Sequence, residues 1–263
     1  MQEYTRTDQT LHQLAQLLAK AGRSFVPQQD DDSHTNLYFD AMGQRLLTHP
    51  FEATGHSLAF SLFAQSFEWV DEQRQTHFIT KLAGQTYQQL EDLLAGAIKD
   101  TGLDADAFRE DLHFDIPEYE AATKPIVPFD NEALGTWRYY RRLANQVGAA
   151  LLGYLEAEGQ ARIWPHHFDT GTYAIIAEKM GIGYGLAMED GMVGAPYFYL
   201  SGYPQNGEVD YDKTLNLSAG RWKVTENWKG AVLPLTDLPP RHAMRVITQF
   251  VREATDWYLQ AAK

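Results

Sequence analysis

The chain has 263 residues, and its 44% hydrophobic and 13% aromatic content is typical of a globular protein with a substantial core. Acidic residues outnumber basic ones by 35 to 22, a net charge of −13, so neither nucleic acid nor an anionic membrane surface is expected as a partner. The chain has no cysteine, which excludes disulfides, thiolate nucleophiles and cysteine-ligated metals. A polar N-terminus and the lack of any apolar run near about 18 residues favour a cytoplasmic protein without a signal peptide or a membrane span.

Hydrophobic periodicity and turn residues predict the elements of the N-terminal part. In chain order these are a helix from Thr7 or Asp8 to Gly22, a strand at 37–39, one continuous strand over 57–70, a returning strand at 77–79, and a helix over 86–99. The segment 57–70 has apolar side chains on both alternating faces, which is typical of a central strand.

A connector over residues 113–129 contains three prolines and is expected to be extended, because each proline disfavours helix before it. A domain boundary near residue 125 would divide the chain into halves 1–125 and 126–263, unless the chain forms one single domain.

The C-terminal part is predicted to begin with a long helix capped by Asp130 or Asn131 and ended by Gly159. The strands expected after it cover residues 162–168, 172–177, 182–187, 197–200, 222–224 and 231–233, and a last helix starts near Pro239. Short connections favour antiparallel pairing. The sequence thus predicts an α+β fold, with antiparallel sheets covered by helices in two similar helix–strands–helix halves.

The segment WPHHFD, residues 164–169, has the highest density of ligand-capable groups in the chain. If it is a strand, Trp164, His166 and Phe168 face one way, and His167 and Asp169 face the other. An imidazole and a carboxylate on one face suit two kinds of chemistry. Asp169 can orient His167 as a general base near neutral pH. Alternatively, the two supply a zinc, manganese or iron ion with ligands. The third ligand would come from His56, Glu178 or Glu189, and spacing fixes none of them.

A structural interpretation of the same segment is equally open. A histidine on an aromatic strand usually hydrogen-bonds a nearby oxygen and stays inert, and Asp169 can cap the turn before Gly171. Pro165 cannot donate a ladder hydrogen bond, so it marks an edge or a bulge in any strand here.

The aromatic segment PYFY, residues 196–199, is the second feature. Tyr197 and Tyr199 share one strand face and suit a pocket wall that stacks on a ligand and hydrogen-bonds it. The alternative is an ordinary strand with amphipathic rings at the sheet surface. The glycine-rich residues 181–185 lack the Lys-Ser/Thr of a phosphate loop and indicate a strand that passes close to another backbone.

WPHHFD followed by PYFY resembles a signature of an uncharacterised family of bacterial proteins, a domain of unknown function. The proline-rich residues 116–130 are similar to the link before that family's long helix, and His56-Ser57 ahead of an apolar strand is similar to its N-terminal half. The resemblance implies an intracellular bacterial α+β protein and carries over no catalytic residues.

Three hypotheses follow for the function. The first is a cytoplasmic protein with a small-molecule site at WPHHFD, working by His/Asp acid–base chemistry or metal-assisted hydrolysis, with cofactor and metal unknown. The second is a non-catalytic metabolite-binding module, and the third is a structural protein that forms a homodimer. The catalytic candidates are His166, His167 and Asp169, and the ligand-binding candidates are Trp164, Tyr197 and Tyr199.

Overall fold

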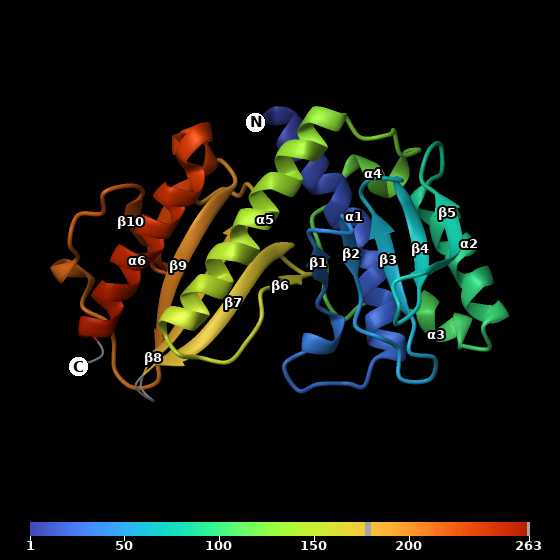
Figure 1. Cartoon of the computed structure of the whole chain (residues 1–263), viewed down its shortest axis with the longest axis horizontal. Helices are drawn as coiled ribbons and strands as arrows, with labels where there is room; N and C mark the ends of the chain where they lie inside the picture. Colours follow the sequence, from blue (N-terminus) through green and yellow to red (C-terminus); the bar gives the residue numbers. More distant parts are fainter. Residues whose placement is uncertain (177–179, 262–263) are drawn as a thin grey trace. The chain divides into compact units, whose positions relative to one another are not determined.

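The computed structural model describes residues 1–176 and 180–261. These residues form six α-helices and two antiparallel sheets, of five and six strands, so the α+β prediction is confirmed (Figure 1). Contacts divide the chain into two compact units. We call residues 2–139 with 163–168 the N-unit, and residues 140–162 with 169–263 the C-unit.

The N-unit contains a meandering sheet in the order β1-β2-β3-β4-β5. Its strands are β1 (Tyr38–Asp40), β2 (Arg45–Leu47), β3 (Ser57–Ser61), β4 (Ser66–Val70) and β5 (Thr76–Lys81). Its helices are α1 (Gln2–Phe25), α2 (Tyr87–Asp100), α3 (Ala105–Arg109) and α4 (Glu120–Thr123). Helix α1 packs against β3, and α2 packs against β5 (Figure 1).

The prediction of one strand over 57–70 was wrong, because this segment is a hairpin of β3 and β4. Every residue of both strands is buried, including the polar residues Ser57, Ser61, Ser66 and Glu68. The turn between them carries Phe63 at its tip, 81% exposed, and Gln65 with φ of 48°. The turn residues 62–65 (LFAQ) include no Gly, Pro, Asn or Asp, so they lack the signal by which a hairpin turn is normally recognised.

Helix α1 starts earlier than predicted, at Gln2, and continues past Gly22 to Phe25. Asp8 does not cap it: the carboxylate is buried and accepts a hydrogen bond from Trp137 Nε1 at 2.7 Å. Gly22 lies inside the helix, where a Cβ would be 2.9 Å from the carbonyl oxygen of His34. This glycine therefore allows the close approach of another segment and does not end the helix.

The prediction for α2 was confirmed: Thr86 and Gln89 form a capping box, and Gly102 follows its end with φ of 82°. The short helix α3 was not predicted, and α4 interrupts the connector that was expected to be extended.

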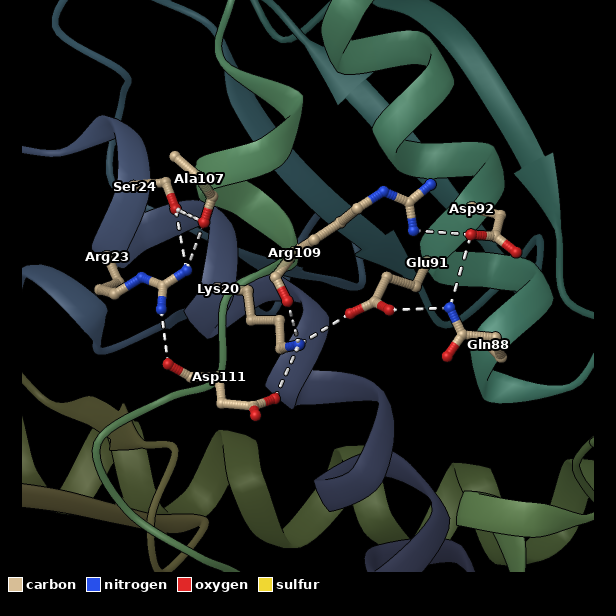
Figure 2. A network of polar contacts seen from close by, with 9 residues as sticks. All are labelled: Lys20, Arg23, Ser24, Gln88, Glu91, Asp92, Ala107, Arg109 and Asp111. Atoms are coloured by element: carbon tan, nitrogen blue, oxygen red, sulfur yellow. Dashed lines mark hydrogen bonds and ion pairs between the residues drawn. The ribbon is translucent and has the colours of Figure 1, made fainter.

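A polar network joins α3 and the chain after it to α1 and α2 (Figure 2). Lys20 Nζ donates to Glu91 Oε1 at 2.7 Å and to the Arg109 carbonyl at 3.2 Å. Arg23 donates to the carbonyls of Ala107, at 2.6 Å, and Asp111, at 2.7 Å. The network satisfies carbonyl groups at the end of α3, so we assign it a structural role.

The second sheet has the order β10-β11-β9-β8-β7-β6, and its strands lie in the C-unit except for residues 163–164 of β6, which count with the N-unit. In chain order the elements are α5 (Asn131–Tyr154), β6 (Arg162–Trp164), β7 (Asp169–Ile176), β8 (Met180–Ala187), β9 (Tyr197–Pro204), β10 (Arg221–Val224), β11 (Lys229–Pro234) and α6 (Ala243–Ala261). Asp130 caps α5, as predicted, by accepting from the Ala133 N–H at 2.8 Å. The helix ends at Tyr154, before the predicted end at Gly159. Residue 177, the last residue of the strand predicted over 172–177, lies outside the described residues.

Helices α5 and α6 cover one face of this sheet (Figure 1). Gly148 of α5 lies over the cross-strand pair Thr172 and Tyr184, and Tyr258 of α6 lies over Gly202. Each unit thus repeats the order helix, strands, helix. By contacts the boundary falls inside α5, between Tyr139 and Tyr140, and residues 163–168 count with the N-unit. The division into domains 1–125 and 126–263 stays a prediction. No described helix combines the length and apolar content needed to cross a bilayer.

Candidate functional site

WPHHFD is a turn over most of its length. Strand β6 stops at Trp164, whose carbonyl accepts hydrogen bonds from the N–H groups of His167, at 3.3 Å, and Phe168, at 2.6 Å. Phe168 has a left-handed backbone with φ of 54°. The predicted strand alternation was therefore wrong, because Pro165 cannot donate to a ladder and the chain turns there.

The turn separates the residues that were expected to act together. His167 is exposed, and its ring contacts that of His166, with centroids 4.4 Å apart and planes tilted by 55°. His166 also contacts the rings of Trp164 and Phe114. Asp169 begins β7 in the C-unit, where it accepts a hydrogen bond from the Tyr199 hydroxyl at 2.5 Å. The expectation that His167 and Asp169 share a strand face was wrong, and their catalytic roles stay predictions.

The carbonyl of Pro165 at the centre of the window binds two side chains of α1. It accepts hydrogen bonds from His12 Nε2 at 2.8 Å and from Gln16 Nε2 at 2.9 Å. The Phe168 ring stacks on the His12 ring, with centroids 5.2 Å apart and planes 9° apart. The WPHHFD segment thus fixes the ring of His12, a residue that is only 1% exposed.

The Pro165 carbonyl fixes the role of one nitrogen of His12. A carbonyl oxygen only accepts, so Nε2 carries a proton, and in the neutral ring Nδ1 is then an acceptor. The hydroxyl oxygen of Tyr119 lies 3.0 Å from Nδ1 and donates to it when the His12 ring is neutral. Burial, and then the charge of Asp8, raises the pKa of Tyr119 to about 12, which keeps this hydroxyl protonated at neutral pH.

Tyr119 also lines a cavity of about 720 Å³ in the N-unit, which we call the connector cavity. Its volume lies within the roughly 300–1,000 Å³ that is typical of ligand pockets. One wall is the face of α1 that carries Arg6, Thr7 and Thr10, and the opposite wall is α4 with the proline-rich residues 124–130.

Charges at the mouth of the connector cavity are paired. Arg6 lies 3.8 Å from Glu3 on α1, and Lys124 lies 2.7 Å from Glu120 on α4. Lys124 and, more weakly, Arg6 lower the pKa of Glu120, so Arg6 on α1 acts on Glu120 of α4 across the mouth. All four side chains of these pairs are well exposed, and an ordinary pocket rim is polar in the same way.

The tyrosines of PYFY share one face of β9, as predicted. The Tyr197 hydroxyl donates to Asp190 at 2.7 Å, and the Tyr199 hydroxyl donates to Asp169. Burial and these carboxylates raise the pKa of both tyrosines. The Tyr199 ring lies over β8 at Gly185, where a Cβ would be 2.7 Å from the ring and 2.3 Å from the Thr170 carbonyl oxygen. The glycine-rich strand therefore does pass close to a neighbouring backbone, and tyrosine rings fill the space above it. The role of Tyr197 and Tyr199 as a ligand wall stays a prediction.

The ligands expected for a metal do not come together in the described ranges. Among residues 1–176 and 180–261, no group of three or more His, Asp or Glu side chains is arranged to hold an ion. His56 bonds the Thr54 carbonyl through Nδ1 at 2.9 Å and packs against Trp69 and His77. Glu178 lies outside the described residues.

Sequence reasoning missed both His12 and Tyr119. His12 and Gln16 are spaced i, i+4 next to the leucine stripe of α1, and two polar residues beside a buried stripe were a usable signal. Tyr119 lies in the connector and carries no comparable signal.

Comparison of the chain with models of protein families, with curated proteins and with solved structures gave no match. The resemblance to a bacterial family of unknown function stays a prediction, and the chemistry of the site has to be argued from its geometry.

Proposed function

We propose that the protein binds a small molecule in the connector cavity, with Tyr119 as its polar anchor. The observation that carries this proposal is the contact between Tyr119 Oη and His12 Nδ1, because it orients a cavity-lining hydroxyl. The WPHHFD segment supports the site from behind, since Pro165 and Phe168 fix the ring of His12.

The orientation of Tyr119 restricts the ligand. Its proton is directed at His12, so the hydroxyl offers the cavity lone pairs, and the ligand needs an N–H or O–H donor. Pro125, Val127 and Phe129 provide an apolar wall, and Val127 is 77% exposed. Thr7 and Thr10 add hydroxyl groups on the other wall. These features favour a neutral ligand with an apolar ring and at least one donor.

Binding is a better proposal than acid–base catalysis at WPHHFD. Tyr119 stays protonated near neutral pH and so is no base there. His167 is exposed and contacts the ring of His166, and the Asp169 carboxylate accepts a hydrogen bond from Tyr199.

The proposal is tested by saturation-transfer NMR with neutral phenols and indoles as probes. Thr10→Trp would fill the cavity from α1, and Thr236→Trp would place the same side chain on an exposed position of the 3-10 helix Leu235–Asp237. We expect probe signals with the wild type and Thr236→Trp, and their loss with Thr10→Trp. Equal signals in both variants, or none with the wild type, would refute the proposal.

A further inference from the structure

A second pocket, of about 280 Å³, lies in the C-unit at the end of β9. It shares no lining residue with the connector cavity. Its aromatic members come from three elements: Tyr203 from β9, Tyr211 from the 3-10 helix Tyr211–Lys213, and Trp228 from the β10–β11 hairpin. We call it the hairpin pocket.

The hairpin turn is built to present its tip. The Thr225 N–H donates to the Trp228 carbonyl at 2.9 Å, and the Trp228 N–H donates to the Thr225 hydroxyl at 3.0 Å. Glu226 and Asn227 are therefore held at the tip, where both are exposed and line the pocket. The hydroxyls of Tyr211 and Tyr258 lie 2.8 Å apart, which fixes the ring of Tyr211.

The pocket has an excess of negative charge. Glu208 and Glu226 line it, and neither carboxylate forms an ion pair with a described residue. The cation in the lining is Lys229, whose Nζ lies 6.0 Å from the centroid of the Tyr211 ring. This distance is at the outer limit for a cation–π contact. Lys229 therefore interacts only weakly with the face of the Tyr211 ring, which can still attract a bound cation.

Aromatic rings with unpaired carboxylates are the groups that recognise a quaternary ammonium ion. Its methyl groups pack on ring faces, its charge interacts with the ring quadrupoles and the carboxylates, and it has no N–H that needs an acceptor. We propose that the hairpin pocket binds the quaternary ammonium group of a small ligand between Tyr203, Tyr211 and Trp228, with Glu208 and Glu226 balancing the charge.

Lys229 gives the proposal a consequence of opposite sign. Its charge repels a bound cation, so its removal should tighten binding, whereas removal of a ring or a carboxylate should weaken it. A pocket that merely binds apolar groups would not distinguish these changes by sign.

The probe is choline, titrated by calorimetry at constant ionic strength against 3,3-dimethyl-1-butanol, its uncharged isostere. We expect choline to bind at least about tenfold more tightly than the isostere, because ring and carboxylate terms act on the charge alone. We expect Trp228→Leu and Glu226→Gln to weaken choline binding about five- to tenfold, and Lys229→Met to strengthen it.

Glu118→Gln is the matched control, since it removes the same charge from an exposed position in the N-unit. We expect it to leave the affinity unchanged. Because Trp228→Leu can disturb the hairpin, the opposite responses of Glu226→Gln and Lys229→Met, both checked by circular dichroism, decide the test. Equal affinity for choline and the isostere, or no binding of choline by the wild type, would overturn the proposal. So would binding of an uncharged sugar, tested with glucose, in place of choline.

Discussion

His12 and Tyr119, 107 residues apart in the chain, meet with the imidazole Nδ1 3.0 Å from the phenol oxygen. His12 is buried, and Tyr119 is at the wall of the connector cavity. A side chain fixed by the interior thus sets the hydrogen-bonding direction of one that faces a ligand-sized space.

Tyr119→Phe removes the donor to His12 and leaves the cavity almost unchanged in shape. We expect the free energy of unfolding to fall by about 1–2 kcal/mol, because His12 Nδ1 loses this partner in a buried place. Binding of phenols in the connector cavity should weaken, and binding of benzene derivatives without a donor should persist. Urea denaturation and NMR titration measure the two effects. In the control Tyr154→Phe, the hydroxyl lost is bonded to Asp256 at an exposed position, and a comparable loss of stability there would argue against the assigned role.

Stability should decline in alkali through Tyr119. Its folded pKa of about 12 lies above the ordinary value of 10.0, so the folded state holds the proton more tightly than the unfolded state. The resulting stabilisation is complete below pH 10 and is lost as the pH rises from 10 through 12. Urea denaturation at several pH values should show a shallower decline for Tyr119→Phe than for the wild type. Parallel curves would contradict the burial of this phenol.

Two ion pairs of equal length should differ in their contribution to stability. Lys20–Glu91 and Lys124–Glu120 are both 2.7 Å long, but the side chains of the first are 10% and 8% exposed, and those of the second 67% and 64%. Glu91→Ala should cost about 3 kcal/mol by leaving Lys20 charged in the interior, whereas Glu120→Ala should cost less than about 1 kcal/mol. Equilibrium denaturation of both variants provides the comparison, and similar losses would show that the network of Figure 2 is solvated.

His167→Ala tests the catalytic prediction made from WPHHFD. The side chain is exposed, so we expect changes in stability within about 0.5 kcal/mol. Phenol binding in the connector cavity should be unaffected as well. His12→Ala, in contrast, should lower both quantities because it removes the stacked ring and both hydrogen bonds. If His167→Ala abolished binding while His12→Ala did not, the site would have to be moved to the exposed turn.

Local patterns in the sequence predicted most of the elements. The periodicity of α2 and α5 and the glycine punctuation of β8 and β9 identify them without tertiary information. The hairpin of β3 and β4 was not predicted, because its turn is as apolar as its strands. The sequence analysis did not predict strand β2, which is three residues long.

The site was less predictable than the fold, for physical reasons. The residues 164–169 were singled out from the sequence, but the chain turns at the proline in the second position, where a strand was predicted. The consequence of that turn depends on α1, far away in the sequence, since His12 bonds the Pro165 carbonyl. Every residue has a backbone carbonyl oxygen, so the sequence does not indicate which of them accepts a side-chain hydrogen bond. A contact of this kind is visible only in the structure.

Side chains of neighbouring strands cover the glycine positions of β8. Where Gly185 has only hydrogen, the ring of Tyr199 from the adjoining strand occupies the vacant volume. A Cβ at position 185 would also lie 2.3 Å from the Thr170 carbonyl oxygen, so a smaller residue at 199 alone would not admit a side chain at 185. The side chains that cover this strand thus come from its neighbours, and the pairing register determines which ring covers which glycine.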